Sequence, residues 1–316
     1  MQIFTNVEFG ARHREGLTSD VAPDEIYFGD PEQLSTADRT ALLQSEIAFG
    51  SCPPDLLMPA RELRWLQLDS VGCDQYRGLD WERLSRRLTV TNLRGFFAVP
   101  VAETGIASAL ALYRAIDRAV ELRRLRSWRQ AELRSQLRTL AGANALVAGY
   151  GAIGHALESR LTAFGSIVQT FGSPSSAPNL STLPELDDAL PRADIVFLAL
   201  PETDRTRGMF GPGRLNRLKP GAILVNLGRG SVVDENALLR LLASGILAGA
   251  ALDVTQAEPL PPDSPLWTAP NVILTQHTAG GSAGELDGKA DVFLANLMRY
   301  RSGLPLSGIV DWAKGY

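Results

Sequence analysis

The sequence predicts an α/β protein in which doubly wound parallel sheets form two domains. The chain has 316 residues, which corresponds to about two domains of ordinary size. Short apolar runs alternate with helical patterns along most of it, as in proteins built from βα units. Glycine accounts for 29 residues. The glycines beyond the usual number cluster from Gly142 onward, at the turns between predicted strands and helices.

The composition describes a globular chain whose ligands are small. Hydrophobic residues make up 45% and charged residues 21%, and the net charge is −4 with a pI near 5.5. This acidic balance argues against a protein whose main task is to bind nucleic acid or an anionic membrane surface. The two cysteines, Cys52 and Cys73, lack C-x-x-C spacing, and neither a signal-peptide pattern nor a membrane-spanning run is evident. We therefore expect a cytoplasmic protein with no metal site, no nucleic-acid partner and no membrane contact.

From residue 142 onward the predicted strands are continuously apolar rather than alternating. Continuous apolarity indicates strands that are buried on both faces, as in a parallel sheet covered by helices. A helical pattern over residues 234–244, ended by Gly245, lies between two of these strands. The predicted strands of this half are residues 145–149, 166–171, 193–200, 222–227, 248–254 and 271–275.

The first hundred residues have a weaker α/β pattern, which predicts a second, smaller domain. Its predicted strands are residues 1–7, 26–29, 46–50, 65–69 and 88–91. Residues 101–140 have a helical pattern, with apolar residues spaced by three and four, and their later part is rich in arginine. In an acidic protein this pattern favours a solvated or subunit-facing helix over a phosphate-binding one.

A glycine-rich sequence follows the strand predicted at residues 145–149. It reads Gly149-Tyr150-Gly151-Ala152-Ile153-Gly154, a G-x-G-x-x-G that opens a helix reaching about Phe164. The first glycine permits a tight turn, the second lets a pyrophosphate approach the backbone, and the third lets the helix pack on the strand. The helix N-terminus adds N–H donors and partial positive charge. We therefore predict a Rossmann-like domain that binds a dinucleotide through these six residues. A glycine-rich turn without a ligand, or another nucleotide-binding fold such as a methyltransferase, is the alternative.

The end of the next strand bears on the choice between NAD and NADP. A carboxylate about 20 residues after the first glycine is typical of NAD-binding domains. Residues 168–173 contain none, and the next carboxylate is Glu185. Ser173, a predicted cofactor contact, and the serines after it are able to donate hydrogen bonds to a 2′-phosphate, although residues 161–191 contain no Arg or Lys. We expect NADP or NAD, with NADP favoured, and use of both cofactors is the alternative.

Three polar side chains follow the carboxyl ends of late strands: Arg229, Glu258 and His277. Open α/β sheets bind their ligands at that edge. Together the three supply a cation for a carboxylate, a proton donor for a carbonyl oxygen, and a carboxylate that keeps an imidazole protonated. They are therefore the predicted catalytic residues for reduction of a 2-keto acid. The other histidines, His13 and His155, fit ordinary surface positions better.

The chain resembles the D-isomer-specific 2-hydroxyacid dehydrogenases, and the resemblance extends over nearly the whole sequence. The motifs that carry it are VNLGRGSVVD at residues 225–234, GAALDV at 249–254 with EPLP at 258–261 and PLW at 265–267, and TQHT at 275–278. The resemblance implies that Arg229 binds the substrate carboxylate and carbonyl, that His277 is the acid–base, and that Glu258 pairs with His277. It also implies two Rossmann-like domains, of which the substrate domain is discontinuous.

The same resemblance assigns the remaining site residues. Val71 and Gly72 would hold the substrate carboxylate through their backbone N–H groups, and Asp253 would hold the nicotinamide carboxamide. Further cofactor contacts would come from Leu200, Pro201, Thr206, Leu227, Gly228, His277 and Gly280.

The resemblance also divides the chain into its domains. It implies a substrate domain at residues 1–98 and 288–316. It places a dinucleotide-binding domain at residues 99–287, with the helices of a homodimer interface inside residues 101–140. We therefore expect a homodimer.

These predictions combine into one predicted activity with two alternatives. The prediction is an NAD(P)-dependent enzyme that reduces a small 2-keto acid to the D-2-hydroxy acid, with glyoxylate and hydroxypyruvate as first candidates. Glu258, in place of glutamine, argues against formate-dehydrogenase-like chemistry. The alternatives are oxidation of another acid, such as phosphite, on the same fold, and a cofactor-sensing binding protein with poor turnover.

Two departures from the family pattern bear on the site. Residues 93–97 are bulkier than expected and would narrow the pocket, and Arg94 among them is either a further anion contact or a solvated side chain. Gln276 replaces a common proline before the histidine.

Overall fold

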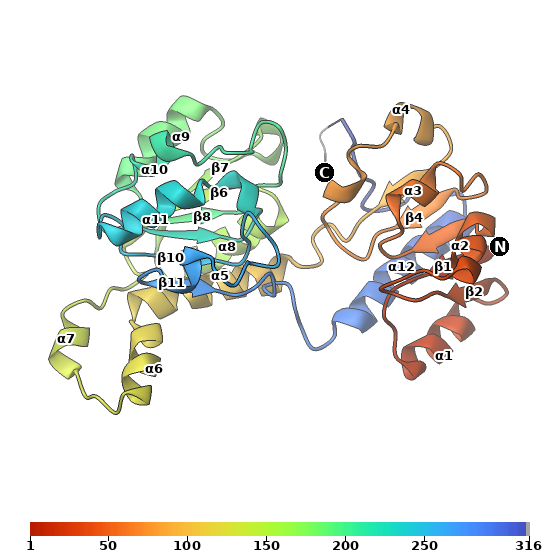
Figure 1. Cartoon of the computed structure of the whole chain (residues 1–316). Helices are drawn as coiled ribbons and strands as arrows, with labels where there is room; N and C mark the ends of the chain where they lie inside the picture. Colours follow the sequence, from red (N-terminus) through yellow and green to blue (C-terminus); the bar gives the residue numbers. More distant parts are fainter. Residues whose placement is uncertain (314–316) are drawn as a thin grey trace. The chain divides into compact units, whose positions relative to one another are not determined.

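The structure is a computed structural model that describes residues 1–313. The chain divides into two compact units, one made of Met1–Phe96 with Ser282–Tyr316 and the other of Phe97–Gly281 (Figure 1). The first unit is therefore discontinuous in sequence. The boundaries expected at 98/99 and 287/288 lie two and six residues further along the chain. The last three residues of the expected segment 288–316 lie outside the described residues.

A five-stranded parallel sheet forms the centre of the first unit. Its strands, in the spatial order β2-β1-β3-β4-β5, are β1 (Gln2–Thr5), β2 (Glu25–Phe28), β3 (Ile47–Phe49), β4 (Trp65–Gln67) and β5 (Thr89–Thr91). Its helices are α1 (Ala11–Asp20), α2 (Thr36–Gln44), α3 (Pro54–Leu57), η1 (Asp74–Tyr76), α4 (Trp81–Leu84) and α12 (Glu285–Arg301).

Both faces of this sheet are buried, because successive residues of each strand enter different cores. Ile47 and Trp65 belong to one core, in which the ring of Phe293 from α12 stacks on Trp65 at 5.3 Å. Ala48 and Leu66, the next residues along the same strands, belong to the other core. The C-terminal helix thus completes the unit begun by the N-terminal residues, which explains why the domain is discontinuous.

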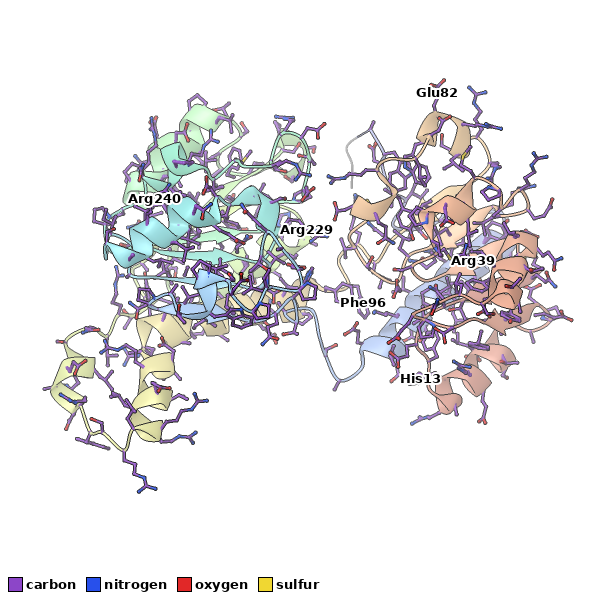
Figure 2. The ribbon with its side chains drawn as sticks, viewed as in Figure 1. His13, Arg39, Glu82, Phe96, Arg229 and Arg240 are labelled. Carbon is purple, nitrogen blue, oxygen red and sulfur yellow. The ribbon has the colours of Figure 1, made fainter. Side chains whose placement is uncertain are left out.

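His13 has a structural place in the first unit (Figure 2). It lies on α1, where its Nε2 is 3.1 Å from Oδ1 of Asp287 on α12 and its ring packs on Phe9. The contact joins two helices of one unit, in agreement with the ordinary surface position expected for this histidine.

A six-stranded parallel sheet forms the centre of the second unit, in the order β11-β10-β9-β8-β6-β7. The strands are β6 (Asn144–Ala148), β7 (Ile167–Phe171), β8 (Ile195–Leu198), β9 (Ile223–Asn226), β10 (Gly249–Leu252) and β11 (Val272–Leu274). The helical segments are α5 (Ala98–Tyr113), α6 (Ile116–Arg124), α7 (Gln130–Arg134), α8 (Ala152–Ala163), η2 (Pro174–Ser176), α9 (Leu183–Ala189), η3 (Leu190–Arg192), α10 (Pro212–Leu215), η4 (Gly230–Val232), α11 (Glu235–Ala243) and η5 (Pro265–Trp267).

The strand order reverses between β6 and β8, since β7 lies on one side of β6 and all later strands lie on the other. Doubly wound sheets bind ligands outside the carboxyl ends of the strands at such a point. Alternate residues of β6 enter different cores, with Leu146 on one face of the sheet and Val147 on the other. The predicted fold class, two doubly wound parallel α/β domains, is confirmed.

The helical pattern over residues 101–140 is not one helix. Ala115 and Arg126 both have a φ of 51°, in the left-handed region that breaks an α-helix, so α5, α6 and α7 are separate. No residue of α6 or α7 is buried. In Figure 1 these two helices extend away from the sheet of their own unit. The helical pattern thus corresponds to three helices, and most of the arginine-rich part of this segment is solvent-exposed.

A partly buried ion pair at the amino ends of β6 and β8 predicts a pH-dependent part of the stability. Asp194 accepts hydrogen bonds from Lys219 Nζ at 2.7 Å and from the backbone N–H of Asn144 at 2.9 Å. Burial alone would raise the pKa of Asp194, but the hydrogen bonds from Lys219 and Asn144 outweigh it and lower that pKa. Because the folded state favours the charged carboxylate, this contribution is present above the usual carboxyl value of 3.8 and is lost as the pH falls below it.

Asp194→Asn is therefore expected to lower the free energy of unfolding by about 1–2 kcal/mol at pH 7. Urea unfolding of the native and variant proteins measures this, and the difference between them should shrink as the pH falls toward 3. A difference that is absent at pH 7, or that grows in acid, would show that the carboxylate charge does not stabilise the fold.

Candidate functional site

The glycine-rich turn after β6 has the geometry of a dinucleotide-binding turn. Gly149 has a φ of 109°, and a Cβ placed on it would lie 2.4 Å from the carbonyl carbon of Ala199. A Cβ on Gly154 would lie 2.3 Å from the carbonyl oxygen of Gly149, so the helix packs directly on the turn. A Cβ on Gly151, at the start of α8, would meet no protein atom. The space before the α8 N-terminus is thus open to a pyrophosphate group, and the residues present fit a nicotinamide dinucleotide.

Tyr150 lies along α8 rather than across the turn. Its hydroxyl donates a hydrogen bond to Glu158, and its ring centroid is 4.0 Å from that of His155. The hydrogen bond to Glu158 raises the pKa of Tyr150 to about 12. His155 itself is exposed, as expected for a position on the helix surface.

The loop after β7 carries the serines considered for a 2′-phosphate. Ser173 Oγ lies 3.0 Å from Ser175 Oγ, and Ser176 Oγ donates to the carbonyl of Ser173 at 2.8 Å. A Cβ on Gly172 would lie 3.0 Å from Cβ of Tyr150, so the end of β7 adjoins the glycine-rich turn. The structure therefore brings Ser173 close to the predicted dinucleotide site.

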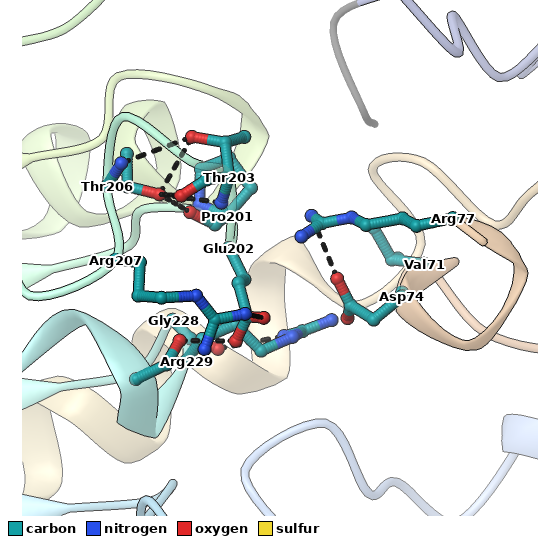
Figure 3. A network of polar contacts seen from close by, with 12 residues as sticks. Val71, Asp74, Arg77, Pro201, Glu202, Thr203, Thr206, Arg207, Gly228 and Arg229 are labelled. Atoms are coloured by element: carbon teal, nitrogen blue, oxygen red, sulfur yellow. Dashed lines mark hydrogen bonds and ion pairs between the residues drawn. The ribbon is translucent and has the colours of Figure 1, made fainter.

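The loop after β8 is held by its own threonines (Figure 3). Thr206 Oγ1 donates to the carbonyl of Pro201 at 2.6 Å and accepts from the backbone N–H of Thr203 at 2.8 Å. Thr206 is buried, and Leu200 beside this loop is buried as well. The side chain of Thr206 thus shapes the loop, so a cofactor contact at Pro201 or Thr206 would be made mainly by the backbone.

The turn that carries Arg229 is fixed by the last residue of β9. Asn226 is buried, its Nδ2 donates to the carbonyl of Arg229 at 3.1 Å, and its Oδ1 accepts from the N–H of Gly228 at 3.2 Å. A Cβ on Gly228 would lie 2.4 Å from the carbonyl oxygen of Leu200, so this turn packs directly on the preceding loop. Leu227 is buried against Gly105 of α5, and Arg229 remains half-buried at the carboxyl edge of the sheet.

Glu202 connects the loop after β8 to the turn after β9, and the sequence interpretation missed it. Its carboxylate accepts hydrogen bonds from Ser231 Oγ and from the guanidinium of Arg207 (Figure 3). Ser231 is two residues from Arg229, so this contact stabilises the turn that carries Arg229. The sequence feature that could have identified Glu202 is its carboxylate, which directly follows Pro201 in the predicted cofactor loop.

His277 and Glu258 form the predicted pair. Nδ1 of His277 lies 2.7 Å from Oε2 of Glu258, and the other carboxylate oxygen accepts from the N–H of Thr255 at 2.9 Å. The His277 side chain is 52% exposed and that of Glu258 is 37% exposed, so Nε2 of the imidazole can be reached by a ligand. The pair is therefore oriented for proton transfer through Nε2.

The backbone before this histidine has an unusual conformation. Gln276 and His277 have φ values of 54° and 57°, both in the left-handed region. A proline ring fixes φ near −65°, so a proline at position 276 is incompatible with this turn. The departure noted at Gln276 therefore matches the local backbone of this chain.

Asp253 holds the His277 turn together. It is buried, and its Oδ1 accepts hydrogen bonds from Thr275 Oγ1 at 2.6 Å, from the N–H of Thr278 at 3.0 Å and from the N–H of Ala279 at 3.1 Å. Its carbonyl oxygen accepts from the N–H of His277 at 2.6 Å. These four bonds stabilise consecutive left-handed residues that would otherwise be unfavourable.

A cavity of about 440 Å³ in the second unit adjoins the histidine and its carboxylate partner. Its polar lining consists of Asp253, Thr255, Glu258, Gln276 and His277. Its remaining lining is apolar and consists of Leu252, Pro259, Leu260, Trp267 and Leu274. A mostly apolar cavity with a few convergent polar groups is typical of a small-molecule site.

Val71 and Gly72 belong to the first unit, in the loop after β4. Asn92 Nδ2 donates to the carbonyl of Val71 at 2.9 Å, and Ser70 Oγ donates to the carbonyl of Gly72 at 2.8 Å. Within residues 1–313 the backbone N–H groups of Val71 and Gly72 donate to no protein acceptor. The loop is thus fixed through its carbonyls. Next to it, Asp74 and Arg77 form an ion pair at 2.9 Å (Figure 3).

The bulky residues near the unit boundary pack on glycines. A Cβ on Gly280 would lie 2.9 Å from the ring of Phe97, and a Cβ on Gly288 would lie 2.6 Å from the ring of Phe96. Each pair lies within one unit. Arg94 is exposed, as both alternatives for this side chain require.

The part of the chain that the structure describes was also searched for metal clusters and for membrane-spanning helices. Residues 1–313 contain no cluster of three or more His, Cys, Asp or Glu side chains suited to a metal ion. No helix in this range has both the length and the apolar composition required to cross a membrane.

Comparison with known proteins decides the family. Residues 106–279 match the model of the "D-isomer specific 2-hydroxyacid dehydrogenase, NAD binding domain". The chain belongs to the D-isomer specific 2-hydroxyacid dehydrogenase family. A glyoxylate reductase of Korarchaeum cryptofilum is 32% identical to this dehydrogenase over 252 residues, which cover 77% of the chain and 75% of the relative.

Two solved structures extend the similarity to the whole chain. A D-isomer specific 2-hydroxyacid dehydrogenase family protein from Aeromonas salmonicida has a TM-score of 0.83 and 30% identity, with 98% of this chain and 99% of the other covered. A family member from Xanthobacter autotrophicus, in complex with NADPH and MES, has a TM-score of 0.82 and 27% identity, with 100% and 99% covered.

These findings confirm the predicted family and its enzyme class, an NAD(P)-dependent 2-hydroxyacid dehydrogenase. They also confirm that the cofactor of this dehydrogenase is NAD or NADP.

Proposed function

We propose that this enzyme reduces a small 2-keto acid to the D-2-hydroxy acid, with His277 as the acid that protonates the carbonyl oxygen. The observation that carries the proposal is the 2.7 Å contact between His277 Nδ1 and Glu258 Oε2, at the carboxyl edge of the second sheet. The contact at Nδ1 fixes the orientation of the imidazole, so that Nε2 is the proton donor. The alkoxide oxygen that forms during reduction takes this proton.

Arg229 orients the substrate in this proposal. Its guanidinium is able to form two parallel hydrogen bonds with a carboxylate, which fixes the carboxylate plane as well as its position. The backbone of this turn is held by Asn226 and by the close approach of Gly228 to Leu200. A rigid turn of this kind limits the orientations available to the carbonyl that His277 protonates.

The cofactor would be held by residues of the second unit, and its nicotinamide ring supplies the hydride when bound. The pyrophosphate would be held at the α8 N-terminus by the glycine-rich turn, which consists of Gly149, Tyr150, Gly151, Ala152, Ile153 and Gly154. Ser173 would lie beside the adenosine ribose. The ribose and nicotinamide end would contact Leu200, Pro201, Thr206, Leu227, Gly228, Asp253, His277 and Gly280. NADP is favoured over NAD, since the loop after β7 carries serines and no carboxylate, and the Xanthobacter relative is in complex with NADPH.

The first unit would supply the remaining contacts of the substrate. The backbone N–H groups of Val71 and Gly72 suit a carboxylate, because they are donors without an acceptor within the described residues. The proposed substrate domain therefore consists of residues 1–98 and 288–316. The proposed dinucleotide-binding domain consists of residues 99–287.

Glyoxylate and hydroxypyruvate are the first candidate substrates, in line with the name of the Korarchaeum relative. The test is the initial rate of NADPH and NADH oxidation with glyoxylate, hydroxypyruvate, pyruvate and phenylpyruvate. We expect turnover with glyoxylate, hydroxypyruvate or both. We also expect a higher kcat/KM with NADPH than with NADH. No turnover with any combination, while cofactor binding is still measurable, would contradict the proposed function.

We propose further that the enzyme is a cytoplasmic homodimer that pairs through α5, α6 and α7. Leu125 and Trp128, between α6 and α7, are 67% and 88% exposed, which is unusual for large apolar side chains. The buried thiols of Cys52 and Cys73 agree with a reducing compartment. Light scattering should give twice the chain mass of 34.1 kDa, and a mass equal to one chain at micromolar concentration would refute the pairing.

A further inference from the structure

We propose that Glu235 is a positioning residue for the acid–base pair, because its carboxylate holds the loop that carries Glu258. The inference rests on the proposed function, in which Glu258 orients His277. Glu235 lies in the first turn of α11, outside the predicted site and outside the contacts of the histidine itself.

Two hydrogen bonds tie this loop to the start of α11. Glu235 Oε1 accepts from the backbone N–H of Gln256 at 2.5 Å. The side chain of Gln256 donates in turn to the carbonyl of Val233 at 2.6 Å. Gln256 is thus held at its backbone and at the end of its side chain. A residue anchored at both points fixes the path of the loop that follows it.

The same loop is also packed on the turn that carries Arg229. A Cβ on Gly230 would lie 2.0 Å from the carbonyl carbon of Thr255 and 2.5 Å from the backbone nitrogen of Gln256. The peptide between Thr255 and Gln256 therefore passes directly over Gly230, the residue after Arg229. The bond from Glu235 keeps this peptide in place, so one carboxylate fixes the loop of Glu258 relative to the turn of Arg229.

The position of Glu258 depends on the path of this loop. One of its oxygens accepts from the N–H of Thr255 at 2.9 Å, and the other lies 2.7 Å from His277 Nδ1. The loop is short, with Thr255 Oγ1 donating to the carbonyl of Ala257 at 2.8 Å. A shift of the Thr255–Gln256 peptide would therefore move the carboxylate away from the imidazole.

The acceptor oxygen of Glu235, rather than its charge, performs this role. Burial raises the pKa of Glu235, the bond from Gln256 opposes this rise, and the like charge of Glu258 adds to it. A second negative charge near Glu258 is thus unfavourable in itself. Glutamine offers the same acceptor oxygen without the charge, which makes Glu235→Gln the conservative variant and Glu235→Ala the disruptive one.

The experiment compares the two variants by steady-state kinetics and by amide hydrogen exchange of the cofactor-free protein. Glu235→Ala should lower kcat about 10- to 100-fold with KM for the keto acid within about threefold, because misalignment affects the chemical step. It should also accelerate exchange in the segment that contains Gln256. Glu235→Gln should keep kcat and the exchange rate within about threefold of the native values.

Asp234→Ala is the matched control, since Asp234 caps the same helix through the N–H of Ala237 and its side chain forms no hydrogen bond with the loop of Gln256 within residues 1–313. It should lower Tm without lowering kcat. Equal losses of kcat in Asp234→Ala and Glu235→Ala at equal losses of Tm would overturn the proposal, as would native exchange and native kcat in Glu235→Ala. A His277→Ala variant as active as the native enzyme would refute the proposed function instead, and the exchange measurement would still decide whether Glu235 holds the loop.

Discussion

Replacement of His277 by alanine is expected to lower kcat about 10²- to 10⁴-fold, the usual contribution of a positioned general acid. The carbonyl oxygen would then have to take its proton from water, because Glu258 would keep its carboxylate but lose the imidazole that it orients at 2.7 Å. Binding of the reduced cofactor should change much less than kcat, since His277 is one of many proposed cofactor contacts and the pyrophosphate turn lies at the start of α8. Steady-state rates and a fluorescence titration with NADPH measure the two effects separately.

His13→Ala is the control for this variant. His13 lies on α1 in the first unit, where it contacts Asp287, and its loss should leave kcat within about twofold. If His277→Ala turned over at the native rate, another group would have to supply the proton, and the role assigned to His277 would be wrong.

Replacement of Arg229 by alanine is expected to lower kcat/KM on the order of 10²- to 10³-fold, because a substrate carboxylate would lose its charged, bidentate partner. Most of the loss should appear as a higher KM for the keto acid. Arg229→Lys keeps the charge but not the planar fork, so it should recover only part of the loss. Rates measured over a range of keto-acid concentrations separate the effects on KM and kcat.

Arg240 provides the comparison, since it is an exposed arginine on α11 of the same unit (Figure 2). Arg240→Ala should leave kcat/KM within about twofold. An Arg229→Ala variant with unchanged KM would mean that the substrate carboxylate is bound elsewhere.

The strands were predictable from the sequence because their burial is nearly complete. Residues 195–198 and 223–226 are buried throughout, so their apolar runs were continuous and marked the strands to within a few residues. The break after α5 was not predictable in the same way. Ala115 is a good helix former, and its left-handed conformation depends on the surrounding structure rather than on its own preference.

The candidate site was predictable where side-chain chemistry defines it and not where backbone geometry does. Arg229, Glu258 and His277 are marked by residue type and by their place after strands. The left-handed backbone at His277 has no such signal, because glycine is absent and the conformation is held by Asp253 through space. Glu235 was missed for a similar reason, since it contacts a backbone N–H 21 residues away in the sequence.

The proposed reaction is transfer of a hydride to C2 of a 2-keto acid, which forms the D-isomer of the 2-hydroxy acid. The test is incubation of hydroxypyruvate with NADPH that carries deuterium at C4 of the nicotinamide ring. Two preparations are compared, with the deuterium on opposite faces of that ring. We expect one of the two preparations to give D-glycerate with a single deuterium on C2. Product without deuterium from both preparations, or L-glycerate, would contradict it.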